Sequence, residues 1–481
     1  ARVRIMHRES TNARIRLKFI IYCPSLSAPA AEELLDQEYF SQTQDQVNVK
    51  ETNHLYGAYA YYACWVNQPD ETIWREYDIM EPLTSEYNDV KKTSGVKNMK
   101  NKKAIRIAVA CLAVILCPLI IYGVLYAAMY ISGFMQINKN IEYQNNHLEY
   151  LKSEYYNSSY ASADEQKFAD FDIEKAFEQG VRINEIAVIG THNSYQTLAT
   201  PQKRLLEKVR NVLSSGEKGG NRNFEMDTYT EQLENGVRNL EIDIETVDDG
   251  KDISFIVTHS PITDNVSSAY DFAKGLEEIA MWSDNNPNHL PVYLLIEPKK
   301  NVDSINNMKE FSVEYALELD SVIRETLGDR LLTPELVKGE FESLGEMRMA
   351  DSWPTLKEAS GKILVLLHPC DVTEEYINTD TAISSQAMFP MLRFEDIEKP
   401  YASFILDNEP EIAMENNRIT VDEKRLMVRT RADNYPDFTD EQYGYTDVCG
   451  SHIITTDYPP RSVRADEHTY DFDGYTVKLL R

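Results

Sequence analysis

The sequence has little positive charge: 49 Lys and Arg stand against 78 Asp and Glu in 481 residues, for a net charge of −29. A general nucleic-acid binder would show a basic surface, so this class is excluded, although one local basic pocket is not. No internal repeat or low-complexity tract stands out. Cysteine is also scarce, and of six only Cys370 and Cys449 lie in the C-terminal two thirds, where they could form one disulfide. Hydrophobic residues still reach 42%, which is enough to build a packed core.

One stretch, residues 107–138, lacks Asp, Glu, Lys, Arg and His altogether. Its apolar part, Ile107 to about Phe134, would be roughly 42 Å long as a helix at 1.5 Å per residue. That length exceeds the hydrocarbon core of a bilayer, and Pro118 is tolerated inside a membrane helix. A cleaved signal peptide is the alternative, but its apolar region would be only about 7–15 residues long. We therefore predict an uncleaved, transmembrane signal anchor within residues 99–135.

The charges around this run predict its orientation. The basic residues of the N-terminal flank are Lys91, Lys92, Lys97, Lys100, Lys102, Lys103 and Arg106, and the first basic residue after the run is Lys139. The positive-inside rule then places the N-terminus in the cytoplasm. We predict a single-pass protein of the cell membrane whose C-terminal domain, residues 139–481, is extracytoplasmic.

The segments on either side of the barrel region are less informative. Residues 1–98 show no clear period, and we assign them no function. Because the sequence begins with Ala1 and not Met, we expect a fragment or an upstream extension; alternatively, Met80 or Met99 could be the natural start. Residues 136–170 contain neither Gly nor Pro and are rich in Asn, Tyr, Ser and Glu. We predict that they form an extracytoplasmic stalk, helical around His147–Tyr155.

From about residue 171 onward, β-rich runs alternate with helical patterns such as Ala269–Trp282 and Met308–Leu327. Alternation of this kind predicts a parallel sheet. The eight candidate strands are Glu185–Gly190, Asn239–Glu245, Ile253–Thr258, Val292–Glu297, Lys362–Leu367, Ala402–Leu406, Leu426–Thr430 and His452–Thr456. Eight such units in about 310 residues predict an α/β fold, a (β/α)₈ TIM barrel over residues 171–481, with irregular fifth to seventh connections.

Polar side chains gather at the ends of the first four candidate strands, where the active sites of such barrels lie. They are His192 and Asn193 after the first, Glu241 and Asp243 on the second, His259 after the third and Glu297 on the fourth. Alternation puts Glu241, Asp243 and Glu245 on one face of their strand, where carboxylates are costly unless paired or bound to a cation. Oxygen ligands alone suit a hard cation such as Ca²⁺. Two histidines beside such a metal suit proton transfer at a phosphodiester.

Several separated segments resemble those of the phosphoinositide-specific phospholipase C barrel, and more narrowly its calcium-dependent bacterial and fungal group. The main ones are Arg182–Tyr195 (RINEIAVIGTHNSY) and Gly236–Asp243 (GVRNLEID). Supporting segments are Trp282–Pro291, Asp351–Leu356, Gly361–Leu367, Val428–Asp433 and Thr456–Pro459. The resemblance covers roughly residues 175–480.

This resemblance implies a role for each candidate residue. His192 would steady the phosphoryl group or take the proton of the attacking hydroxyl, and His259 would protonate the departing diacylglycerol oxygen. The implied calcium ligands are Asn193, Glu241, Asp243 and Glu297, with Glu241 also a candidate base. Lys299, Arg429 and Arg431 are candidates to bind inositol or phosphate oxygens, since Arg suits bidentate phosphate contacts. The implied substrate is a phosphoinositide or related phospholipid, which the inositol 2-hydroxyl would cleave to a cyclic phosphate.

Two alternatives remain open. A glycerophosphodiester phosphodiesterase shares the barrel, but it typically shows His-Arg-Gly after its first strand, where this chain has His192-Asn193-Ser194. A catalytically inactive, tethered binding domain should have lost a histidine or a metal ligand, and none is missing. The sequence does not determine the oligomeric state.

Overall fold

The computed structural model describes residues 4–6, 16–22, 59–65, 76–78, 97–198, 225–261, 265–301, 307–433, 439–463 and 468–480. The chain divides into two compact units, Ala1–Leu116 and Cys117–Arg481. In the first unit, four short strands form a sheet in the order β2-β3-β1-β4. They are β1 (Arg4–Met6), β2 (Arg16–Tyr22), β3 (Tyr59–Trp65) and β4 (Glu76–Asp78). The sequence did not predict this sheet.

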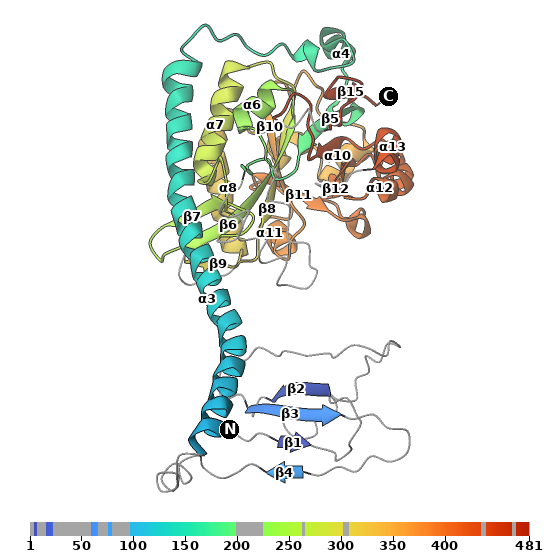
Figure 1. Ribbon diagram of the computed structural model, residues 1–481. Coiled ribbons are helices and arrows are strands. Elements are labelled where there is room, and N and C mark those ends of the chain that lie inside the picture. Colours follow the sequence, from blue (N-terminus) through green and yellow to red (C-terminus); the bar gives the residue numbers. More distant parts are fainter. Residues whose placement is uncertain are drawn as a thin grey trace. The chain divides into compact units, whose positions relative to one another are not determined.

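The second unit contains a closed barrel of eight parallel strands, as predicted (Figure 1). Its strands are, in chain order, β5 (Ile186–Thr191), β6 (Asn239–Asp248), β8 (Val292–Pro298), β10 (Ile363–Leu367), β11 (Met388–Leu392), β12 (Phe404–Leu406), β13 (Met427–Arg431) and β14 (Ile453–Thr456). Pairing of β5 with β14 on one side and β6 on the other closes the sheet. Two further short strands lie at its margins, β15 (Val477–Leu479) against β5 and β9 (Met308–Lys309) against β6.

One predicted barrel strand was wrong. The run Ile253–Thr258 forms β7 (Ile253–Val257), which pairs antiparallel with the outer half of β6 and lies outside the barrel. The turn between them contains Asp249-Gly250, a strong hairpin signal that the alternating pattern obscured. The fifth barrel strand is instead β11, which the sequence did not predict because Pro390 interrupts it and proline usually argues against a strand.

Helices surround the barrel. They are α4 (Ile173–Gln179), α6 (Tyr229–Glu234), α7 (Phe272–Asn285), α8 (Val313–Leu327), α9 (Pro334–Lys338), α10 (Leu344–Met349), α11 (Thr373–Thr379), α12 (Pro410–Asn417) and α13 (Asp440–Val448). On β6, Leu240, Ile242 and Ile244 belong to the main hydrophobic cluster, together with residues of α7 and α8. The alternate residues of β6, which include the acidic ones, therefore face the inside of the barrel.

A single helix, α3 (Lys97–Tyr150), precedes the barrel and continues as a π-helical turn, Leu151–Tyr155. Among the described residues there is one helical segment, Ile120–Tyr155, that is long enough and apolar enough to cross a membrane. Only 6% of its most apolar 18 residues are buried. The C-terminal part of α3 contacts α7. Lys152 pairs with Glu277 at 2.6 Å, His147 lies 3.2 Å from Glu278, and Leu151 is buried. The predicted stalk over residues 136–170 did not anticipate these contacts.

The two cysteines of the barrel are both free. Cys449 is buried and donates its thiol to the carbonyl of Thr446, whereas Cys370 is partly exposed beside Thr373. The disulfide that the sequence left open between Cys370 and Cys449 is therefore not formed.

Candidate active site

The barrel mouth, by which we mean the face formed by the carboxyl ends of the eight parallel strands, collects most of the predicted site residues. Strand register brings the acidic ones together, because Asp243 on β6 is paired directly with Glu297 on β8. Asp243 is completely buried, Glu241 is 4% exposed and Glu297 is partly exposed. One carboxylate oxygen from each of these three residues lies within 4.8 Å of the other two. The acidic cluster expected from the sequence is present.

Lys299 lies between two of these carboxylates. Its Nζ is 2.9 Å from Asp243 Oδ2 and 2.8 Å from Glu297 Oε1. Burial raises the pKa of Asp243 to about 7 despite the opposing effect of Lys299. For Glu297, burial is outweighed by Lys299, so the pKa of that carboxyl is lowered. Lys299 therefore partly neutralises the acidic cluster, a contact that the sequence did not predict.

The acidic cluster fits a hard cation by two observations. It offers only oxygen donors, the ligands that Ca²⁺ prefers. In addition, Asp243 Oδ1 is buried and accepts no hydrogen bond from any described group, and a buried carboxylate oxygen without a partner is costly. Asn193, the fourth predicted ligand, is 8% exposed at the end of β5, and its Oδ1 lies 3.4 Å from the hydroxyl of Tyr195. Its φ of 48° is a left-handed conformation that Asn tolerates better than most residues.

Glu241 forms a buried ion pair that the sequence did not predict. Its Oε2 accepts a hydrogen bond from the guanidinium of Arg429 on β13, and Arg429 itself is 2% exposed. Burial alone would raise the pKa of Glu241, but Arg429 and then His192 outweigh it and lower that pKa to about 2. Glu241 is therefore ionised at neutral pH. Arg429, predicted to bind substrate oxygens, is engaged by Glu241 and by Asn408 instead.

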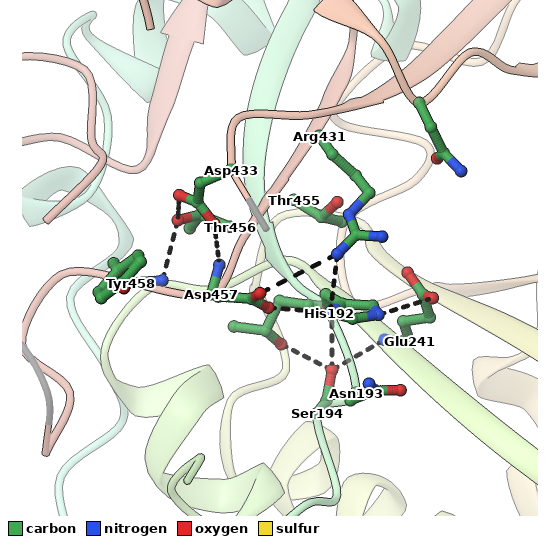
Figure 2. A network of polar contacts seen from close by, with 12 residues as sticks. His192, Asn193, Ser194, Glu241, Arg431, Asp433, Thr455, Thr456, Asp457 and Tyr458 are labelled. Carbon is green, nitrogen blue, oxygen red and sulfur yellow. Dashed lines mark hydrogen bonds and ion pairs between the residues drawn. The ribbon is translucent and has the colours of Figure 1, made fainter. Parts of the chain in front are cut away.

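His192 is oriented by an aspartate from the opposite end of the barrel sequence (Figure 2). Its Nδ1 lies 2.9 Å from Oδ1 of Asp457, which follows β14 and is almost completely buried. The same nitrogen lies 3.0 Å from the guanidinium of Arg431, so the two contacts together hold the plane of the ring. The other nitrogen, Nε2, faces Glu241 Oε1 at 4.0 Å. A carboxylate beside an imidazole favours its protonated form.

Asp457 is in turn held by its neighbours, which Figure 2 shows beside it. Its backbone N–H donates to Oδ1 of Asp433 at 2.6 Å, and Asp433 also accepts from Thr456 and Tyr443. Burial, followed by repulsion from Asp457, raises the pKa of Asp433 to about 6. Arg431, a predicted substrate-binding residue, has its NH2 group 3.0 Å from His192 Nδ1 and 3.9 Å from Asp457 Oδ2. Its guanidinium is 18% exposed, so it can reach an anion at the mouth.

His259 reaches the mouth by a different path from the one predicted. It follows β7, whose hairpin brings the chain back until Val257 is level with Ile244, itself paired with the last residue of β8. The backbone N–H of Thr258 donates to the carbonyl of Asp243, and the ring of His259 is exposed. Asn265 in the same loop is completely buried, with its side-chain nitrogen donating to the carbonyls of Gly133 and Pro261. The sequence Asn265-Val266-Ser267, which fits an N-glycosylation acceptor, is therefore buried in the folded chain.

Sequence reasoning missed two residues of the site, Asp457 and His368. Each follows a barrel strand, β14 and β10 respectively, so the strand-end rule that found His192 could have found both. Burial lowers the pKa of His368, although Glu297 and Glu241 oppose that effect. The mouth thus combines the oriented, partly buried His192, the exposed His259, a cation-compatible acidic cluster and the partly exposed Arg431. Such a set can transfer protons at a phosphodiester and stabilise its charge.

The chain matches one protein family and is similar to several solved structures. Residues 181–256 and 251–480 match the family described as "Phosphoinositide phospholipase C, Ca2+-dependent". Among solved structures, the chain is similar to the calcium-dependent phosphoinositol-specific phospholipase C of a Pseudomonas species, with 16% identity, a TM-score of 0.43 and coverage of 65% of this chain and 98% of that one. It is also similar to the Ca²⁺-dependent phosphatidylinositol-specific enzyme of Streptomyces antibioticus, with 19% identity, a TM-score of 0.41 and coverage of 58% and 95%. No curated protein matches the sequence.

Proposed function

Because the chain belongs to the family of Ca²⁺-dependent phosphoinositide phospholipases C, and is therefore a phosphoric diester hydrolase, we propose that it cleaves phosphatidylinositol-type lipids in a membrane. The products would be diacylglycerol and a cyclic inositol phosphate. One observation supports this proposal above all: His192, held at Nδ1 by Asp457, lies at the same barrel mouth as the acidic cluster. The apolar helix α3 supports anchoring of the enzyme in the membrane that holds its substrate.

In the proposed reaction, Nε2 of His192 takes the proton of the inositol 2-hydroxyl. The hydroxyl oxygen forms a bond to phosphorus while the bond from phosphorus to the diacylglycerol oxygen breaks. His259 gives its proton to that departing oxygen. Asp457 stabilises the imidazolium that forms on His192, as the 2.9 Å contact supports. Arg431, which is partly exposed beside His192, binds a phosphoryl oxygen.

The metal completes this proposal. Asn193, Glu241, Asp243 and Glu297 would hold Ca²⁺, and Lys299 would move aside from the carboxylates it now bridges. When bound, Ca²⁺ would neutralise charge on the phosphoryl oxygens and favour ionisation of the attacking hydroxyl. Glu241 is already ionised and so is ready to act as a ligand without releasing a proton.

The test uses the full chain in vesicles that contain phosphatidylinositol and, separately, soluble glycerophosphoinositol, each with and without calcium. Phosphorus NMR identifies the products. A cyclic inositol phosphate released from the lipid in the presence of calcium supports the proposal. Cleavage of glycerophosphoinositol alone would indicate a glycerophosphodiester phosphodiesterase, and no cleavage of either would indicate an inactive binding domain.

Variants of the two histidines test the assignment of roles. His192→Ala and His259→Ala should each lower kcat by about 10² or more, the usual scale for a positioned acid or base. The midpoint of thermal unfolding serves as the control, since both residues lie at the mouth and not in the packed layers. Near-wild-type kcat in either variant removes that residue from the mechanism.

A further inference from the structure

The helix that carries the apolar segment is attached to the barrel in a defined direction. Gln144 of α3 bonds with the backbone of Asp271, the residue that caps the N-terminus of α7, by donating at 2.9 Å and accepting at 2.8 Å. Further along both helices, His147 lies beside Glu278. Beyond them, Tyr160 contacts Asn286, just after the end of α7. Residue numbers rise together in these contacts, so α3 and α7 run parallel.

The direction of α7 gives the direction of α3 relative to the barrel. Helix α7 starts after β7, at the level of the mouth, because Ile256 forms a bridge with Asp271. It ends before β8 begins, at the opposite face, which we call the barrel base. Because α3 runs the same way, its residues 117–132 extend past the mouth and away from the base. Figure 1 shows α3 leaving the barrel at the end where β6, β7 and β9 lie.

The attachment is tightest at the mouth itself. Asn265, in the loop that carries His259, donates to the carbonyl of Gly133, and its own carbonyl accepts from Asn140. Gly133, Asn140 and Asn265 are all buried. The apolar run ends at about Phe134, so the barrel contact at Gly133 lies at the end of the membrane segment. No flexible spacer separates the proposed membrane segment from the mouth.

We propose that α3 holds the barrel mouth directly against the bilayer that α3 spans, so that the partner of the mouth is the surface of the enzyme's own membrane. This inference rests on the membrane anchoring proposed above and specifies its geometry. From Gly133 back to Cys117 the helix rises by about 24 Å, most of the hydrocarbon thickness of a bilayer, which is about 30 Å. The covalent anchor is needed because residues 139–481 carry 34 basic and 64 acidic residues, and an acidic surface is repelled by anionic lipid.

The geometry has a direct experimental readout. The β6–β7 turn projects beyond the mouth and Lys251 at its tip is exposed, whereas Leu336 on α9 is exposed near the base. Proximity of α9 to the base follows from the bridge between Leu331 and Ile363, the first residue of β10. A fluorescent amino acid is placed at position 251 or 336 of the full chain, which is reconstituted in vesicles with a quencher on the lipid headgroups. Quenching at position 251 should exceed that at 336 at least twofold.

Two insertions after Tyr130 test the orientation of the barrel mouth without changing the fold of the barrel. Seven helix-forming residues preserve the rotational phase of α3 to within about 20° and lift the mouth by about 10 Å. Seven Gly and Ser residues remove the fixed direction. Both variants should hydrolyse soluble glycerophosphoinositol, or a short-chain phosphatidylinositol below its micelle concentration, at the wild-type rate. On phosphatidylinositol in their own vesicles, both should be at least tenfold slower, and only the Gly and Ser variant should lose the quenching difference.

The quenching result is independent of turnover, so the outcomes are distinguishable. Equal quenching at the two positions in the unaltered helix, or stronger quenching at 336, overturns the proposed geometry even if the lipid is cleaved. A clear difference without cleavage of any substrate leaves the geometry standing and overturns the proposed function. Wild-type activity of the Gly and Ser variant on vesicle lipid also overturns the inference, because cleavage of the lipid would then not require a fixed orientation of the mouth.

Discussion

The contact between Asp457 and His192 allows a sharp test of the proposed chemistry, through Asp457→Asn. The substitution keeps the size of the side chain and one acceptor oxygen but removes the charge that faces Nδ1 at 2.9 Å. A hydrogen bond to a charged group contributes about 1.5–3 kcal/mol. If that stabilisation applies to the imidazolium formed in the transition state, kcat should fall about 10- to 150-fold. KM should change little, because Asp457 acts through His192 and is a positioning residue.

Asp320→Asn provides the matched control. Asp320 is also a buried aspartate, and its two oxygens accept from the hydroxyl of Tyr376 at 2.7 and 2.8 Å, but it lies on α8. The same chemical change there should leave kcat within about twofold of wild type. Turnover of phosphatidylinositol is measured for both variants alongside urea unfolding. Wild-type kcat in Asp457→Asn, or a loss that merely follows the unfolded fraction, would refute the positioning role.

Three further predictions concern the metal, pH and packing. Calcium should raise the unfolding temperature of the wild type, because a hundredfold excess over Kd adds about 2.7 kcal/mol to the free energy of unfolding. Glu297→Gln should need at least tenfold more calcium for the same rise. Full wild-type activity in chelator, with a melting temperature that calcium leaves unchanged, contradicts this prediction. Burial raises the pKa of Asp320 to about 6 even though its hydrogen bond acts in the opposite direction, so the folded state holds this proton more tightly than the unfolded chain. The contribution of Asp320 to the free energy of unfolding should therefore fall by about 2 kcal/mol as pH rises from about 4 to about 7, and urea unfolding of Asp320→Asn at pH 4 and 7 should lack most of that fall. Gly190→Ala would place a Cβ 2.5 Å from Oδ1 of Asn239 and should cost about 1–3 kcal/mol by overpacking, whereas Gly444→Ala in α13 meets nothing within 4 Å and should stabilise by up to about 1 kcal/mol. Equal unfolding midpoints for the two glycine variants would contradict this prediction, because they would show that Asn239 and its neighbours move to accept the added methyl group.

Local patterns were sufficient where one strand or one helix carries the information. The alternation of Glu241, Asp243 and Glu245 with apolar residues predicted which face of β6 is acidic, because side chains on a strand point to opposite sides in turn. The strand-end rule placed His192, Asn193 and Glu297 at the mouth, because the carboxyl ends of all the parallel strands of a barrel lie on one face. The length and lack of charge of residues 107–134 predicted an apolar helix, since both properties are read within a single segment.

Other features depended on which strands become neighbours, and here the sequence was insufficient. Asp457 meets His192 across 265 positions, because barrel closure brings the first strand beside the last. Arg429 on β13 meets Glu241 on β6 across 188 positions, because both side chains lie inside the closed barrel. A β-rich run has the same period whether its partner is parallel or antiparallel, so β7 was taken for a barrel strand.

The sequence by itself therefore determined the kinds of elements, the acidic face of β6 and the chemical types of residue at the strand ends. The tertiary structure decided that Arg429 neutralises Glu241, that Lys299 bridges Asp243 and Glu297, and that α3 lies along α7. The physical reason is that period and composition report the environment of one segment, whereas ion pairing and docking are properties of two surfaces that only the closed barrel brings together.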